Sequence, residues 1–232
     1  MKRIAVIPAR SGSKRIPGKN TKIFCGKPML AYSIEAALSS GMFDMVMVST
    51  DSEQTAELAK SFGAEVPFLR SEATSNDYAI DRDVQNEVLS ELKKRGLEFD
   101  QMVYIYPCAP FVTAKRLCEA VEKLEKTGAS MVFPVAQYSD NPIRAYYIDE
   151  NGFIKAKWPE YSKMRSQDLP VLYHDCGQFY AFNLDMFYDE ENYRKSWVPL
   201  VIPEEEAQDI DTVDDWKIAE QKYRALHDCE KD

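Results

Sequence analysis

A run of basic side chains near the N-terminal end is the first candidate for chemistry in this sequence. Residues 1–34 contain eight Lys or Arg and no acid, whereas the rest of the chain has 21 basic and 38 acidic residues. Glycine and proline interrupt the run directly after an apolar segment, and backbone amides together with cationic side chains bind phosphate well. We therefore predict an anion site in which four side chains could neutralise a triphosphate: Arg10, Lys14, Arg15 and Lys19.

This basic loop differs from a P-loop. Gly12 and Gly18 are separated by five residues instead of four, and Asn20 follows Lys19 where a Ser or Thr would bind Mg²⁺. The sequence therefore argues against Walker-type hydrolysis and favours triphosphate binding of another kind. The alternative is a solvated basic surface, which is what most charged runs are.

A pair of acids, Asp209 and Asp211, forms the second candidate. They alternate along an extended segment just before the last predicted helix, so both carboxylates point to the same side. Two carboxylates together with substrate phosphates are a usual way to hold Mg²⁺. The alternative is that one aspartate caps the helix and the other is solvated.

A third group lies between residues 165 and 180. Arg165 has the fork geometry that suits a carboxylate, and Gln178 and Tyr180 can donate to hydroxyl groups. His174 stands beside Asp175, but adjacent residues of a strand face opposite sides. We therefore expect a structural or substrate-contacting histidine and no catalytic triad.

Composition excludes several classes of protein. The 232 residues carry a net charge of −9, which argues against a nucleic-acid binder, and no apolar run is long enough to span a membrane. The cysteines form no CxxC pair, so we expect neither a zinc site nor a disulfide framework, but a reducing, cytoplasmic location. The five are scattered along the chain: Cys25, Cys108, Cys118, Cys176 and Cys229.

Apolar segments that alternate with amphipathic ones must position these residues. The strands are predicted at 4–8, 45–49, 65–69, 101–106, 130–135, 178–182 and 198–202. The helices are predicted at 28–41, 53–62 and 80–95, after Thr113, and after Thr212. This alternation is typical of an α/β fold with a Rossmann-like, mostly parallel sheet that helices cover on both faces. The length favours one domain over residues 1–232.

The regular alternation breaks at residues 136–176, which we expect to form an arm inserted into this domain. Two apolar pieces flank the turn at 149–152, which indicates a β-hairpin, and further aromatic residues stand among polar ones. The arm could be a lid, but an aromatic arm that cannot bury itself favours packing against a second subunit. We therefore expect a homodimer.

Taken together, these motifs resemble the cytidylyltransferases that activate nine-carbon and eight-carbon keto-sugar acids, the CMP-sialic acid and CMP-Kdo synthetase family. The resemblance covers essentially the whole chain, and it is carried by the opening segment and by residues 67–70, 107–110 and 209–211. Within the family, residues 104–107, 164–169, 173–180 and 208–212 look most like the branch that uses pseudaminic acid.

The resemblance implies a role for each candidate residue. Arg70 matches a cytidine contact, Asp209 and Asp211 match Mg²⁺ ligands, and the arm matches a dimerisation element. Arg165 matches a position near the sugar-acid carboxylate, with Gln178 and Tyr180 in the same pocket. The loop that grips the CTP phosphates matches Arg10, Ser11, Gly12, Lys19 and Asn20.

Two positions depart from the family pattern. Tyr106 stands where the sialic acid branch has Gln, which makes sialic acid a less favoured substrate. Ser11 stands where Gly is common, a change that should still fit a turn but removes some backbone freedom.

The implied reaction joins CTP to a nonulosonic acid, which this resemblance identifies as pseudaminic acid, and releases pyrophosphate. Arg10, Lys19 and Asp211 would be catalytic, with Arg10 and Lys19 holding the charge on the leaving group. No side chain stands out as the general base. The alternatives are an acceptor of the sialic, legionaminic or Kdo type, or a nucleotide-binding module that has lost catalysis.

Overall fold

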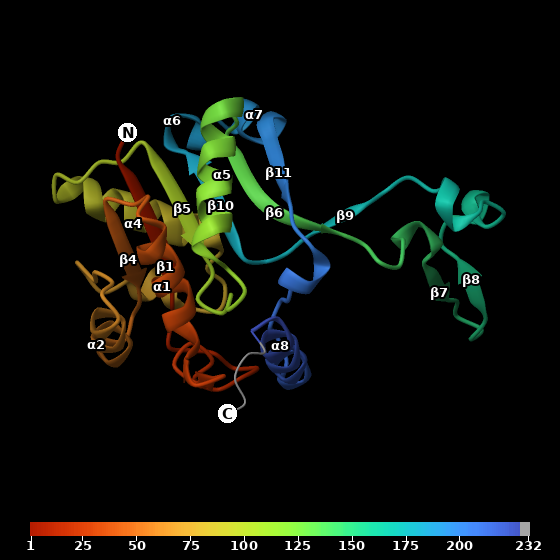
Figure 1. Ribbon diagram of the computed structural model, residues 1–232, viewed down its shortest axis with the longest axis horizontal. Helices are drawn as coiled ribbons and strands as arrows, with labels where there is room; N and C mark the ends of the chain where they lie inside the picture. Colours follow the sequence, from red (N-terminus) through yellow and green to blue (C-terminus); the bar gives the residue numbers. More distant parts are fainter. Residues whose placement is uncertain (228–232) are drawn as a thin grey trace.

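A seven-stranded sheet forms the centre of the computed structural model, which describes residues 1–227 except for the side chains of residues 190 and 192. The order is β11-β6-β10-β5-β1-β4, with β9 also paired to β6 (Figure 1). The strands span Arg3–Pro8 (β1), Met45–Ser49 (β4), Gln101–Ile105 (β5), Met131–Gln137 (β6), Tyr173–Asp175 (β9), Phe179–Asn183 (β10) and Trp197–Val201 (β11). Only β9 and β10 run antiparallel to their neighbours, so the predicted α/β fold with a mostly parallel sheet is confirmed.

Five longer helices connect or follow the strands. They span Met29–Ser40 (α1), Glu53–Ser61 (α2), Asp81–Lys94 (α4), Ala114–Thr127 (α5) and Val213–Leu226 (α8). Thr113 and Thr212 cap α5 and α8 with their side chains, as expected, and Gly41 ends α1 in the left-handed region at φ 63°. Shorter helical segments are Glu72–Ser75 (α3), Leu184–Phe187 (α6), Glu190–Tyr193 (α7) and five 3₁₀ turns, of which η5 (Glu204–Glu206) precedes the two aspartates.

The alternation of β1 divides the core between the two faces of the sheet. Ala5 and Ile7 pack against Leu30 of α1 and Leu117 of α5, whereas side chains on the other face of β1 pack against Val88 of α4. Each buried aliphatic side chain contributes roughly 1.5–3 kcal/mol to the free energy of unfolding. The sheet is therefore a rigid support for the loops at its carboxyl edge.

A third apolar cluster ties the N-terminal loop to the C-terminal helix. The rings of Phe24 and Trp216 meet edge to face at 5.4 Å between centroids. Ile16 of the basic loop and Ile210, which lies between Asp209 and Asp211, are both buried in this cluster. Because Ile210 points into the core, its two acidic neighbours must point the other way.

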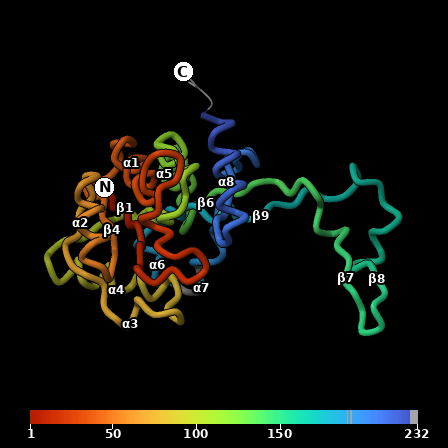
Figure 2. The backbone as a smooth tube through the Cα atoms, turned by 90° about the horizontal axis from the view of Figure 1, so that it is seen from below, coloured from red at the N-terminus to blue at the C-terminus, as the bar shows by residue number. Residues whose placement is uncertain are grey.

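The segment between β6 and β9 leaves the sheet as an extended arm (Figures 1 and 2). It carries the antiparallel hairpin of β7 (Tyr146–Ile148) and β8 (Ile154–Ala156), which confirms the predicted hairpin. Ile148, Phe153 and Ile154 are each about 70% exposed on it.

One predicted strand does not form, and three short strands were not predicted. Residues 65–69 form no strand beyond a single bridge from Glu65 to Met47, because Pro67 cannot donate a ladder hydrogen bond. The short strands β9, β2 (Ile23–Phe24) and β3 (Lys27–Pro28) were not predicted, since two or three residues carry no periodicity.

The described cysteines are free, and Cys229 lies outside the described residues. Within residues 1–227, no helix has both the length and the apolar character that a membrane span requires.

Candidate active site

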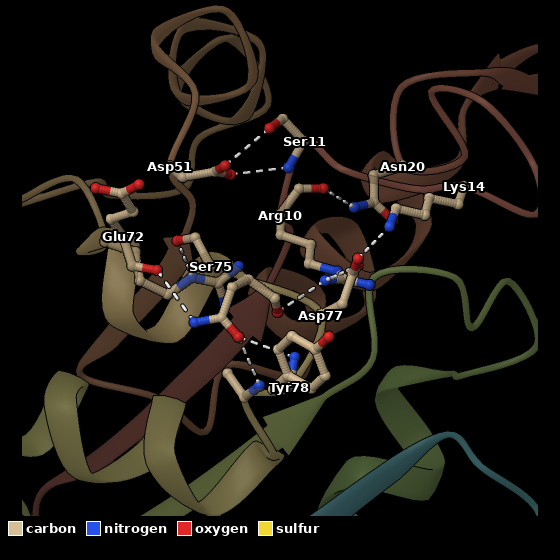
Figure 3. A network of polar contacts seen from close by, with 12 residues as sticks. Arg10, Ser11, Lys14, Asn20, Asp51, Glu72, Ser75, Asp77 and Tyr78 are labelled. Carbon is tan, nitrogen blue, oxygen red and sulfur yellow. Dashed lines mark hydrogen bonds and ion pairs between the residues drawn. The ribbon is translucent and has the colours of Figure 1, made fainter.

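The basic loop follows the carboxyl end of β1, where Arg10 and Lys14 converge on one acid (Figure 3). Arg10 donates to Asp77 at 3.0 Å and to the Asn76 carbonyl at 2.9 Å, and Lys14 also pairs with Asp77. The buried Asn20 fixes the loop from behind, because its Nδ2 donates to the Arg10 carbonyl at 3.0 Å. Both cations thus stand at one edge of the sheet and face solvent.

The loop also reaches the acidic pair, although the two segments lie far apart in the sequence. Lys19 Nζ donates to the Ile210 carbonyl at 2.5 Å and lies 3.8 Å from Asp211 Oδ1. Arg15 donates to Asp211 Oδ2 at 2.7 Å. The N-terminal cations and the C-terminal acids therefore converge on one site.

Asp209 and Asp211 have the donor atoms that a hard cation such as Mg²⁺ prefers. Although Asp209 is exposed overall, partial desolvation of its carboxyl, reinforced by the negative charge of Asp211, raises its pKa, and a bound cation would lower it. The residues from 1 to 227 contain no cluster of three or more His, Cys, Asp or Glu side chains arranged for a metal. Two carboxylates still fit Mg²⁺, which keeps several waters and takes further oxygens from phosphates.

A chain of three hollows begins at this loop. The first, of about 190 Å³, is lined by Arg10, Lys14, Arg15 and Lys19 among others. The second, of about 220 Å³, shares Arg10 and Pro107 with the first and contains the buried Arg70. Burial lowers the pKa of Arg70.

The third hollow, of about 640 Å³, shares Asp81 and Tyr106 with the second and continues to Tyr180. Its outer wall is aromatic, and the rings of Phe133 and Tyr180 stack at 5.8 Å. A ligand with an anionic end and a large end that carries both polar and apolar groups would fit this succession.

The structure brings some predicted residues together and separates others. Arg10, Lys19 and Asn20 line the first hollow, with Lys19 beside Asp211, and Arg70 lies in the adjoining hollow. Ser11 instead faces Asp51, to which its amide and hydroxyl each donate at 2.8 Å (Figure 3). Gly12 is in open space, so no neighbour requires a glycine there.

Arg165 and Gln178 do not join Tyr180. Arg165 lies on the arm, 72% exposed, and donates to Asp168 at 2.7 and 3.1 Å. Gln178 is buried, and its Nε2 donates to the Glu206 carbonyl at 2.5 Å. Within one chain the arm thus separates Arg165 from Tyr180, and a pocket shared by Arg165, Gln178 and Tyr180 stays a prediction.

Asp77, Asp81 and Asp175 were missed by the sequence analysis. Asp81 opens α4, where an acid is common because it favours the helix dipole, so nothing local indicates a second role. Asp175 was considered only beside His174, whose Nε2 instead lies 3.0 Å from Glu204. Asp77 meets the distant basic loop, Asp81 meets Tyr106 at the end of β5, and Asp175 meets Tyr180 across a turn, and only the folded chain reveals these contacts.

Comparison with known proteins agrees with this geometry. The protein family described as "Cytidylyltransferase" matches residues 4–208. Pseudaminic acid cytidylyltransferase of Campylobacter jejuni is 36% identical over 98% of this chain and 99% of its own length. CMP-N,N'-diacetyllegionaminic acid synthase of Legionella pneumophila is 34% identical over 95% of each chain.

A solved structure of CMP:2-keto-3-deoxy-manno-octonic acid synthetase, complexed with CTP, shares the fold. It aligns with a TM-score of 0.67 and 18% identity over 98% of this chain and 99% of that one. The resemblance inferred from the motifs is confirmed. The chain belongs to the cytidylyltransferase family.

Proposed function

We propose that this chain transfers the cytidylyl group of CTP to a nine-carbon keto-sugar acid, with pseudaminic acid as the acceptor. The observation that carries the proposal is the row of three hollows: cations line the first, where Lys19 stands beside Asp211, and aromatic and charged side chains line the large third. The similarity to pseudaminic acid cytidylyltransferase over the whole chain supports the choice of acceptor. We place the reaction in one domain, residues 1–232, and in the cytoplasm, in keeping with the free cysteines.

In this proposal the first two hollows hold CTP. Arg10 and Lys19 bind the phosphates on a loop that includes Ser11, Gly12 and Asn20, and Arg70 contacts the cytidine. Asp209 and Asp211 hold Mg²⁺, which supplies charge stabilisation at the α-phosphate and a lower pKa for the attacking hydroxyl. Lys19, which is 20% exposed beside Asp211, would meet the negative charge that grows on the leaving pyrophosphate.

The bond changes follow from this placement. The acceptor hydroxyl oxygen forms a bond to the α-phosphorus, the bond from that phosphorus to the bridging oxygen breaks, and pyrophosphate leaves in line. The hydroxyl proton leaves to a base that we do not assign. The loop cations hold two anions in contact and shield them from each other, which is the main electrostatic task of the site.

The acceptor lies in the third hollow against Tyr180, with Gln178 supporting the wall behind it. We also propose that the arm pairs two chains into a homodimer, because Ile148, Phe153 and Ile154 form an exposed apolar face. Arg165 would then serve the carboxylate of an acceptor bound to the partner subunit. Ile148→Asp should yield monomers by sedimentation, whereas Leu97→Asp, which alters an exposed apolar residue of the body, should not.

Pyrophosphate release tests the function. We would assay all four nucleoside triphosphates with pseudaminic, legionaminic, N-acetylneuraminic and Kdo-type acids in the presence of Mg²⁺. Turnover only with CTP, and fastest with pseudaminic acid, is the expected result. Faster turnover of another acid would change the acceptor. Calorimetric CTP binding without turnover of any acid would support the alternative of an inactive nucleotide-binding module.

A further inference from the structure

The third hollow contains two pairs of a tyrosine and an aspartate. The Tyr106 hydroxyl donates to Asp81 Oδ2 at 2.5 Å, and the Tyr180 hydroxyl donates to Asp175 Oδ2 at 2.7 Å. The two rings lie edge to face with centroids 5.7 Å apart, so the pairs stand side by side. All four residues line the same cavity.

Each aspartate is itself held by a second donor. Asp175 Oδ1 accepts from the Gly177 amide at 2.8 Å, within a turn where Gly177 has a φ of 60°. Asp81 Oδ1 accepts from the hydroxyl of the buried Tyr104 at 3.2 Å. The orientation of both carboxylates is therefore set by the fold before any ligand enters.

This arrangement decides what the tyrosines offer to a ligand. A phenol has one proton, and here each proton is directed to a carboxylate, so the phenol oxygen can only accept a further hydrogen bond. Burial raises the pKa of Tyr106 and of Tyr180, so both keep their protons in neutral solution. The two phenol oxygens thus present acceptors to a ligand in the cavity.

We propose that Asp175 and Asp81 are positioning residues for specificity, which turn Tyr180 and Tyr106 into acceptors for two N–H or O–H donors of the sugar acid. The inference rests on the proposed function and deepens it. The ligand it selects presents two neighbouring donors, as two acylamino N–H groups do. A glutamine at position 106 would instead offer both a donor and an acceptor, and so would select less strictly.

The Tyr180 pair gives the cleaner test, because Asp81 and Tyr106 also border the second hollow whereas Asp175 and Tyr180 line only the third. In Asp175→Asn, the amide oxygen can still accept from Gly177 and the amide nitrogen faces Tyr180. The phenol must then accept from the asparagine and direct its own proton at the ligand. We expect the KM for the acceptor to rise about tenfold, with little change in kcat or in CTP affinity.

The double variant separates positioning from a structural role. Tyr180→Phe should raise the acceptor KM about tenfold by itself. Adding Asp175→Asn to Tyr180→Phe should change the acceptor KM by less than a further twofold, because Asp175 acts only through the phenol. Glu204→Gln is the matched control, since Glu204 contacts the neighbouring His174 outside the cavity, and its acceptor KM should equal that of the parent.

The experiment uses the full chain with whichever acid gives the fastest pyrophosphate release. An unchanged acceptor KM in Asp175→Asn, or effects that add in the double variant, would overturn the inference. Thermal melting and CTP calorimetry on each variant show whether it has folded; if Asp175→Asn has not, Tyr180→Phe alone decides, and an unchanged KM there also overturns it. Failure of the proposed function is a separate result, since the parent chain would then release no pyrophosphate with any acid.

Discussion

The two ends of the row of hollows are built on different physical principles. At the phosphate end, long cationic side chains sit in exposed ion pairs: the Lys14 side chain is 78% exposed and that of Arg15 is 68% exposed. At the acceptor end, half-buried tyrosines are fixed by short hydrogen bonds to carboxylates. The first end can exchange its partners, whereas the second is already arranged for its ligand.

The difference follows from the energies involved. An exposed ion pair contributes about 0–1 kcal/mol, so a triphosphate can displace Asp77 from Arg10 and Lys14 at little cost. A hydrogen bond from a hydroxyl to a carboxylate is shorter and stronger than a neutral one, so Tyr180 keeps its orientation. We infer that the phosphate end supplies affinity and rate, and that the acceptor end supplies selectivity.

The largest predicted effect is at Lys19. Because its ammonium group stands beside Asp211 where charge develops on the leaving group, Lys19→Ala should lower kcat by at least about a hundredfold. Pyrophosphate release at saturating substrates measures this. Lys22→Ala is the control, since Lys22 lies over the Trp216 ring at 4.8 Å and not in the hollow. Near-parental turnover of Lys19→Ala would refute the assignment of the loop.

Metal dependence is the next largest effect and also belongs to the phosphate end. Chelation by EDTA should abolish activity, and Asp211→Asn should raise the Mg²⁺ concentration needed for half-maximal rate by roughly tenfold or more, because one of two charged ligands is lost. Asp214→Asn, a change at an exposed acid of α8, should leave the Mg²⁺ titration unchanged. If Asp211→Asn and the parent needed the same Mg²⁺ concentration for half-maximal rate, Asp211 would not be a metal ligand.

Glu206 lines none of the three hollows, so its loss should change stability more than selectivity. Its side chain accepts two hydrogen bonds from Arg116, at 2.7 and 2.8 Å, and this contact lowers the pKa of Glu206. Glu206→Gln should lower the free energy of unfolding by about 1–2 kcal/mol at neutral pH, measured by urea denaturation.

The pH dependence of the stabilisation by Glu206 follows from the lowered pKa of this residue. The stabilisation is present above the ordinary glutamate pKa of about 4.3 and is lost as the pH falls through the lower folded value. The difference in the free energy of unfolding between the parent and Glu206→Gln should therefore disappear at acidic pH. If this difference in the free energy of unfolding stayed constant below the ordinary glutamate pKa, the ion pair with Arg116 would not be its cause.

The smallest predicted effect tests whether the exposed ion pairs are easily exchanged. Asp77→Asn removes the acid that Arg10 and Lys14 must leave before they bind phosphate. The KM for CTP should fall roughly two- to fivefold, with the acceptor KM unchanged. Asp168→Asn, which alters an acid of the arm, is the control. A rise in the KM for CTP would mean that Asp77 assists binding.

The two ends also differ in how far the sequence predicts them. The basic loop and the Asp209–Asp211 pair are local patterns, and both were found with their expected strand and helix neighbours. The contact of Asp81 with Tyr106 joins the start of α4 to the end of β5 and is set by how the helix packs on the sheet, whereas that of Asp175 with Tyr180 spans five residues and depends on the turn at Gly177. Neither packing nor turn shape can be read from the types of these residues. In one chain Arg165 pairs with Asp168 on the arm and does not contact Tyr180, because residue spacing says nothing about where an arm points.

A structure of the chain with CTP and Mg²⁺ would show which hollow holds each part of the nucleotide. We expect the phosphates to contact Lys19 and Arg10, the cytosine to lie in the hollow with Arg70, and the cavity of Tyr180 to stay free for the acceptor. A nucleotide whose base occupies the cavity of Tyr180, or whose phosphates lie away from Lys19, would contradict this placement.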